Sequence, residues 1–153
     1  MVSSMSPYVH APLDIVVVVP VSPSTHEIKV SEFRDMLKFL VHCLGPRDRL
    51  GIVTYGGSEV GEIRANLCGS RWPGWEEAIA SIKPIRFRGA RCGLDEGANV
   101  AMDIMMHRKT LNLANVLIIS DTTASDTEKI DFVVERAEAA KYVIRYSLFV
   151  PVY

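Results

Sequence analysis

Three short runs of apolar, mostly β-branched residues set the strongest constraint on how this 153-residue chain folds. They lie at 13–19, 50–55 and 115–120. A continuous apolar run of this length suits a strand that is covered on both faces, as in a parallel sheet. The segments between the runs show helical spacing, so strands and helices alternate. We therefore predict an α/β fold, a three-layer α/β/α sandwich with a mostly parallel, Rossmann-like central sheet and residues 13–19 as its central strand.

The remaining elements follow from apolar spacing and from turn residues. The apolar stripe of the first helix consists of Phe33, Met36, Leu37, Leu40 and Leu44. The further predicted elements are a strand at 50–55, an edge strand at 62–67 that forms a hairpin with it, a short helix at 75–82, a helix at 94–105, a strand at 115–120, a helix at 126–141 and a strand at 142–150.

Composition excludes several classes of protein. The chain has 17 Lys and Arg against 18 Asp and Glu, so it lacks the cationic excess of a nucleic-acid-binding domain, and we expect no nucleic-acid partner. The three cysteines form no C-x-x-C pair, which disfavours a disulfide framework or a thiolate zinc site. The longest apolar run, 15–19, is far below the roughly 20 residues of a membrane helix, so we expect no direct membrane insertion.

The chain reads as one domain with a short leading segment. Residues 1–12 contain Ser and Pro but no basic stretch followed by an apolar one, so we expect a flexible lead-in and not a signal peptide. Residues 13–153 form the predicted domain, which stops directly after its last strand. Two interpretations stay open: the domain is truncated at its C-terminal end, or a sheet edge is left open for a partner or another copy to cover. The expected location is the cytoplasm.

No motif of an enzyme is present. The four histidines stand in no catalytic pattern, and there is no G-x-S-x-G elbow. The glycines at 89, 93 and 97 do not spell G-x-G-x-x-G, and no Walker motif occurs. We therefore expect a protein that is not an enzyme, with no catalytic residue and no cofactor. Ligands of such a sheet bind beyond the carboxyl ends of its central strands, here the loops at 20–24, 88–93 and 121–125.

Sequence landmarks in a fixed order add a resemblance. A strand reading D-I-V-V-V-V and ending in x-V-S-x-S is followed by L-G-P-R-D-R-L-G-I-V-T-Y and later by V-L-I-I-S-D. Over residues 13–150 the chain resembles a von Willebrand factor A (vWA) domain. The resemblance implies a vWA-type form of the predicted sandwich.

In vWA domains a D-x-S-x-S loop, a Thr and a later Asp hold a divalent cation. Ser22, Ser24 and Asp121 match three of these positions. Pro20 replaces the opening Asp, and Cys92 falls near the Thr position. Proline has no side-chain ligand, and a thiol suits a hard cation poorly. The resemblance therefore implies a vestigial site that holds no metal.

A narrower resemblance covers the second half. G-A-N-V-A-M-D at 97–103, R-K at 108–109, I-I-S-D at 118–121, D-F-V-V at 131–134 and R-A-E-A-A-K at 136–141 resemble the vWA domain of fungal pheromone-pathway MAP kinase scaffolds. This implies a non-catalytic domain that binds a MAP kinase kinase and promotes phosphorylation of its MAP kinase in mating signalling. Such a scaffold, with further domains, could reach the plasma membrane or shuttle through the nucleus.

Two alternatives remain open at this point. One is a cation-dependent vWA domain of the copine or adhesion kind, which binds its ligand through the metal. The other is a vWA domain of a ubiquitin ligase that recruits substrates.

A basic segment and a tryptophan are the candidates for a partner-binding surface. The basic residues are Lys83, Arg86, Arg88 and Arg91. Arginine pairs bidentately with carboxylate and phosphate, so an acidic or phosphorylated partner would fit, although charge runs are often only solvated. Trp72 would anchor a partner, because tryptophan is enriched at binding hot spots. Oligomeric state stays open.

Overall fold

The computed structural model describes residues 11–21, 27–84, 93–120, 131, 133–135, 138 and 144–149. Five strands form one sheet in the order β3-β2-β1-β4-β5. The strands are β1 (Leu13–Pro20), β2 (Arg49–Tyr55), β3 (Glu62–Cys68), β4 (Leu113–Ile119) and β5 (Ile144–Phe149). β1 is central and parallel to β2 and β4, β5 is parallel to β4, and only β3 is antiparallel to its neighbour. The predicted mostly parallel sheet, its central strand and the hairpin at its edge are confirmed.

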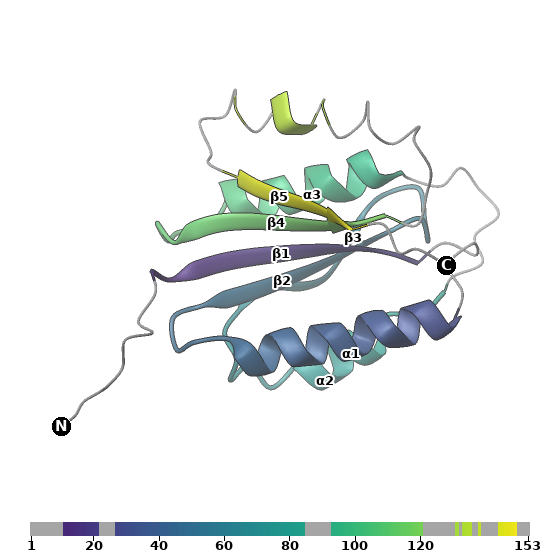
Figure 1. Cartoon of the computed structure of the whole chain (residues 1–153), viewed down its shortest axis with the longest axis horizontal. Helices are drawn as coiled ribbons and strands as arrows, with labels where there is room; N and C mark the ends of the chain where they lie inside the picture. Colours follow the sequence, from purple (N-terminus) through teal and green to yellow (C-terminus); the bar gives the residue numbers. More distant parts are fainter. Residues whose placement is uncertain are drawn as a thin grey trace.

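Helices cover both faces of the sheet, as the three-layer prediction requires. Helices α1 (Glu27–Cys43) and α2 (Trp75–Ala80) lie on one face, and α3 (Leu94–Met106) lies on the other (Figure 1). Of the helix predicted at 126–141, residues 131, 133–135 and 138 are described, and all are helical. Val133 packs in the same cluster as α3, so this segment covers that face too. None of the described helices is long and apolar enough to cross a membrane.

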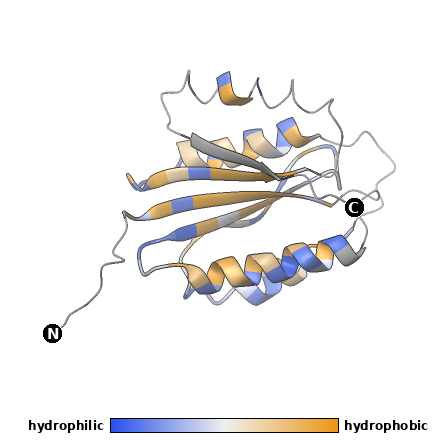
Figure 2. Ribbon diagram, in the orientation of Figure 1, coloured by the Kyte–Doolittle hydropathy of each residue, from blue (hydrophilic) through white to orange (hydrophobic). Residues whose placement is uncertain are grey.

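The valines of β1 explain why this strand lies at the centre. Val16 and Val18 belong to the core beneath α3, whereas Val17 and Val19 belong to the core beneath α1 and α2. All four are fully buried. Successive side chains of a strand point to opposite faces, so an unbroken valine run fills two cores at once. The resulting apolar band along the central strands is visible in Figure 2.

Helix α3 lies unusually close to the sheet. A Cβ atom added at Gly97 would stand 2.8 Å from Val18 Cγ1 and 3.1 Å from Tyr55 Cβ. Such a separation is shorter than carbon atoms tolerate without displacement. Glycine at this position therefore lets the helix backbone rest directly on β1 and β2.

Two boundaries differ from the predictions. Ile82 was expected within the short helix, but α2 ends at Ala80, and Ile82 N donates to Ile79 O at 3.1 Å in a tighter turn. Pro84 has no N–H with which to continue the helical bonding, which accounts for the early end. Ile82 is nevertheless fully buried. β4 begins at Leu113, two residues before the predicted start, because Leu113 N donates to Pro12 O.

Candidate functional site

The carboxyl edge of the central strands is where the sequence predicts a ligand site. Pro20 ends β1 there, is buried and pairs in register with Tyr55. Val21 N donates to Tyr55 O at 2.9 Å and ties the chain down just beyond it. Pro20, which the resemblance places at the opening metal-ligand position, is thus a buried ring without a side-chain oxygen. The other residues that the resemblance assigns to a vestigial metal site, Ser22, Ser24, Cys92 and Asp121, lie outside the described residues.

Three buried hydroxyl-bearing residues lie at this edge, Tyr55, Thr54 and Ser120. The Tyr55 hydroxyl donates to Ile119 O at 2.9 Å in a buried hydrogen bond that spans from β2 to β4. The nearby hydroxyl-bearing residues Thr54 and Ser120 are each 1 % exposed. Thr54 Oγ1 accepts a hydrogen bond from Arg64 Nε at 3.1 Å. Over the described ranges of the chain, no three His, Cys, Asp or Glu side chains gather as metal ligands would.

Trp72, one of the predicted partner-binding residues, is half-buried and held in one orientation. Its ring meets that of Trp75 edge to face, with centroids 5.0 Å apart and an interplanar angle of 86°. A Cβ atom at Gly74 would fall 2.3 Å from the Trp72 ring, so the ring lies against the glycine backbone. Trp75 is 6 % exposed, and its indole N–H donates to Gly69 O at 2.8 Å. Trp75 therefore belongs to the core beneath α1 and α2.

A hollow of about 280 Å³ lies beside Trp72, and we call it the Trp72 hollow. Its lining residues are Arg64, Trp72, Gly74, Glu77, Ala78 and Ser81. Arg64 is paired with Glu62 at 2.8 Å, so the charge of this guanidinium is already partly balanced. Lys83, another predicted residue, is exposed two positions after Ser81. The structure thus places Trp72 and Lys83 at the two ends of α2, while Arg86, Arg88 and Arg91 lie outside the described residues.

The most polar cluster of the described chain lies at the opposite, amino edge of the sheet and was missed by sequence reasoning. Asp14 is fully buried there. Its carboxylate accepts hydrogen bonds from Arg49 Nε and Nη2 at 2.9 Å each, Arg108 Nη1 at 3.0 Å, Thr110 Oγ1 at 2.7 Å and Asn112 Nδ2 at 3.0 Å. We call these five residues the Asp14 network.

Electrostatics keep Asp14 ionised. Burial alone would raise the pKa of its carboxyl group, but hydrogen bonds from Arg49, Thr110 and Asn112 and the positive charge of Arg49 outweigh burial. The pKa falls from 3.8 to about 2. The same pairing raises the pKa of Arg49. A buried carboxylate with this many donors is a stable anion that fixes the position of two guanidinium groups.

One signal in the sequence pointed to this cluster. Asp14 is the single charged residue in the apolar run at 13–19, and a buried charge requires partners. Arg49 could be found from strand pairing, because β1 and β2 align Asp14 with Arg49. Arg108, Thr110 and Asn112 come from the connection between α3 and β4, 94 to 98 residues away along the chain. No spacing rule predicts that meeting.

Comparison with known proteins shows the kind of fold. No protein-family profile matches the chain, and no curated protein sequence does. Solved structures do match. BatB, a conserved hypothetical protein from Bacteroides thetaiotaomicron, superposes with a TM-score of 0.67 at 15% identity over 90% of this chain and 66% of its own. An aerotolerance-related membrane protein from Bacteroides fragilis gives 0.67 at 10% identity over 90% and 67%.

A third similar structure carries the domain name. The vWF domain of the type V pili tip protein Mfa5 from Porphyromonas gingivalis gives a TM-score of 0.56 at 17% identity over 86% of this chain and 51% of its own. The present chain spans about two thirds of the length of the two Bacteroides structures and about half of the Mfa5 structure. At these identities the likeness concerns architecture. The order of the strands and the layering of helices described above are those of a vWA-like fold.

Proposed function

We propose that this chain is a non-catalytic protein-interaction domain that acts in the cytoplasm. The observation that carries the proposal is the buried Pro20 at the end of β1, at the position of the opening metal ligand in a vWA-like fold. A domain of this fold without that carboxylate is expected to bind its partner through side chains and not through a bridging cation. The same observation disfavours the cation-dependent alternative.

The finer proposal is a scaffold role in fungal pheromone signalling. It rests on the resemblance of segments at 97–103, 118–121 and 131–141 to the vWA domain of MAP kinase scaffolds. In this role the domain binds a MAP kinase kinase and presents the MAP kinase for phosphorylation, without reacting with either. A ubiquitin-ligase domain that recruits substrates lacks a comparable supporting feature.

The proposed contact surface combines the Trp72 hollow with Lys83 and the basic residues that follow it. Trp72 is half-buried with its ring fixed by Trp75 and Gly74, so little rotational freedom would be lost when a partner covers it. Lys83 is exposed at the end of α2, on the way to Arg86, Arg88 and Arg91. An aromatic anchor at one end of α2 with cations at the other end suits an acidic or phosphorylated segment of a partner protein.

A reconstituted phosphorylation reaction tests the scaffold role. Purified domain is added to the cognate MAP kinase kinase and MAP kinase, and the initial rate of MAP kinase phosphorylation is measured over a range of domain concentrations. We expect the rate to rise and then to fall at excess, because a surplus of scaffold separates the two kinases onto different molecules. An unchanged rate together with no binding to either kinase would overturn the scaffold role.

Two variants test the surface. One reverses charge at Lys83, Arg86, Arg88 and Arg91, each to Glu, and the other is Trp72→Ala. We expect each to weaken binding of the partner by roughly tenfold or more, as for loss of a hot spot. Lys38→Glu, at an exposed position of α1, is the matched control and should bind as the unaltered domain does. Circular dichroism confirms the fold of each variant, and equal affinity of all three would remove this surface from consideration.

A further inference from the structure

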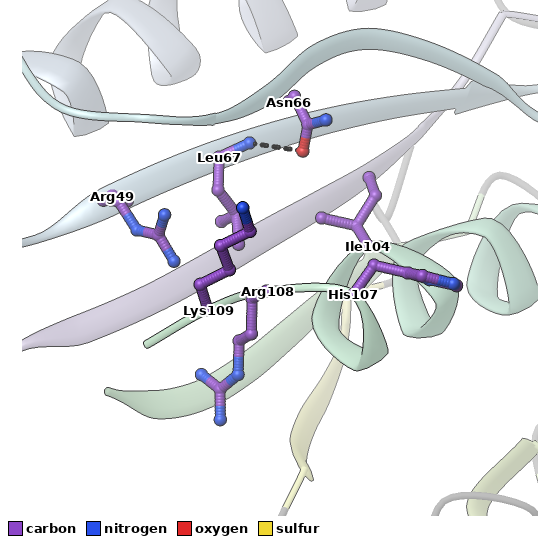
Figure 3. A pocket seen from close by; sticks show the side chains of 7 residues that line it. All are labelled: Arg49, Asn66, Leu67, Ile104, His107, Arg108 and Lys109. Atoms are coloured by element: carbon purple, nitrogen blue, oxygen red, sulfur yellow. Dashed lines mark hydrogen bonds between the residues drawn. The ribbon is translucent and has the colours of Figure 1, made fainter. Parts of the chain in front are cut away.

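A second hollow, of about 360 Å³, lies at the amino edge of the sheet, next to the Asp14 network. Its walls come from the start of β2, the end of β3 and the C-terminal end of α3 with the residues that follow. Figure 3 shows Lys109 rising toward Leu67 with Arg49 to one side, while His107 turns away from them. The hollow shares no lining residue with the Trp72 hollow, so it is a separate feature.

The charges around this hollow do not cancel. Arg49, Arg108 and Lys109 all line it, and none of the described lining residues is acidic. Asp14, behind the wall, is the carboxylate to which Arg49 and Arg108 are paired. Asp48, adjacent to Arg49 in the sequence, is a second buried carboxylate at this edge and accepts from the backbone N–H groups of Leu13 and Gly45. Two negative charges therefore lie beside three positive ones, and all three positive ones line the hollow.

Donors remain available to a ligand. Arg49 uses Nε and Nη2 for Asp14 and Thr110, and its Nη1 donates to no acceptor among the described residues. Asn66 Oδ1 accepts from the N–H of Leu67 at 2.9 Å, and the amide nitrogen of Asn66 lies on the side away from Arg49 and Lys109 (Figure 3). Lys109 is exposed and makes no ion pair with the described part of the chain. A guanidinium and an ammonium group thus offer donors to one small hollow.

We propose that this hollow binds a phosphate monoester group. A phosphomonoester carries a charge of about −1.5 to −2 at pH 7 and three acceptor oxygens, which suits the cationic lining of the hollow and the donors of Arg49 and Lys109. A carboxylate would supply half the charge and fewer acceptors. Because the Asp14 network already holds Arg49 in place, binding loses little side-chain entropy at this residue.

The volume of the hollow limits the size of the molecule or side chain that carries the phosphate. Ligand pockets span roughly 300 to 1,000 Å³, so this one accepts a phosphoryl group and a small part of what bears it. The carrier is either a small phosphorylated molecule or a phosphorylated side chain of a protein. A membrane surface is disfavoured, because lipid headgroups are recognised by a broad cationic face and the chain has a net charge of −1.

Titration with phenyl phosphate, followed by calorimetry and by NMR amide shifts, tests the proposal on the whole chain. We expect saturable binding with shifts at Asn66, Leu67 and Lys109, and weaker binding of benzoate, which has the same ring and one charge. Phosphoserine and a phosphoserine peptide are then compared. Tighter binding of the peptide identifies a protein carrier, whereas equal binding identifies a small molecule, and both results support a phosphomonoester site.

Lys109→Gln is the decisive variant, since Lys109 is exposed and takes no part in the Asp14 network. It should weaken phenyl phosphate binding by roughly tenfold, the usual effect of losing one charged hydrogen bond. The matched control is Lys38→Gln on α1, which should bind as before. Absence of saturable binding, equal weakening by the two variants, benzoate binding as tight as phenyl phosphate, or binding only to phosphatidylserine vesicles would overturn the proposal.

Discussion

The two edges of the sheet bury different kinds of polar side chain. These edges lie at opposite ends of the central strand. Of the buried polar residues in the described chain, the two carboxylates, Asp14 and Asp48, lie at the amino edge. The two hydroxyl residues, Thr54 and Ser120, lie at the carboxyl edge, where β1 ends in Pro20. Metal-binding vWA domains place a ligating carboxylate at the carboxyl edge. In the described residues of this chain, the buried carboxylates lie at the other edge, where Asp14 is paired with arginine and Asp48 accepts from backbone N–H groups.

We therefore expect mutations at the two edges to lower the free energy of unfolding by different amounts. The amino edge relies on a buried carboxylate that must stay paired, whereas the hydroxyl groups buried at the carboxyl edge carry no charge. Removing one partner of a buried ion pair leaves an uncompensated charge, which is more damaging than the loss of a neutral hydrogen bond.

The largest effect is expected for Asp14→Ala. This change leaves Arg49 and Arg108, with side chains 26% and 12% exposed, without their shared carboxylate. We expect the free energy of unfolding to fall by about 3 kcal/mol or more, measured by urea denaturation. Asp35→Ala, at an exposed position of α1, is the control and should change it by less than about 0.5 kcal/mol. Similar values for the two variants would show that the Asp14 network does not stabilise the fold.

Lowering the pH tests the contribution of Asp14 to stability without a mutation. The pKa of Asp14 is about 2 in the folded chain against 3.8 ordinarily, so its contribution is complete above about pH 4 and disappears as the pH falls through 2. We expect this group to account for a loss of about 2 kcal/mol in that window. Urea unfolding at stepwise lower pH measures it. Asp14→Asn, which does not titrate, should show a shallower decline, and an identical slope would contradict the assignment.

A smaller effect is expected at the carboxyl edge from Tyr55→Phe. The change removes the hydroxyl that donates to Ile119 O and leaves the ring in the core. The expected decrease in unfolding free energy is about 1 kcal/mol, the usual contribution of one hydrogen bond between neutral groups. Thermal and urea unfolding of Tyr55→Phe beside Asp14→Ala compares the edges directly. A decrease equal to that of Asp14→Ala would show that the two edges of the sheet do not differ in their contribution to stability.

The smallest expected effect is that of added divalent cation. With Pro20 at the end of β1, magnesium or manganese should leave the melting temperature unchanged, because a ligand raises stability only when it binds the folded state. Differential scanning fluorimetry with and without the cation, and with EDTA, measures this. A clear rise with either cation would mean that the carboxyl edge holds a metal by other ligands and would revive the cation-dependent alternative.

The sequence predicted the architecture better than the site, for a physical reason. Strand and helix patterns are local, so the valine run of β1, the stripe of α1 and the hairpin of β2 and β3 could be read from spacing. Within α3, Met102 and Met105 are buried while Met106 is 42% exposed, as expected for a helix with one face on the sheet. In the described part of the segment at 126–141, the acidic residues at 131, 135 and 138 are exposed, as expected for the outward side of such a helix.

The polar site depends on contacts that local patterns do not encode. Asp14 was visible as a charge within an apolar strand, but three of its four partners lie in an irregular connection far along the chain. The end of α2 depended on the missing N–H of Pro84, a single-residue effect. The partner-binding prediction stands as a proposal, since Trp72 and Lys83 are described and Arg86, Arg88 and Arg91 are not.

Because helix α3 contacts β1 directly at Gly97, a larger residue at this position should tilt the helix about that contact. From Gly97 to Met106 the helix extends roughly 14 Å, at about 1.5 Å per residue, and Lys109 follows shortly after its far end. A methyl group at residue 97 would collide with Val18 and tilt α3. The resulting displacement would be largest at the end of α3 farthest from residue 97. Gly97→Ala should therefore change the distance between Lys109 and Arg49 more than the distance between any two residues close to Gly97.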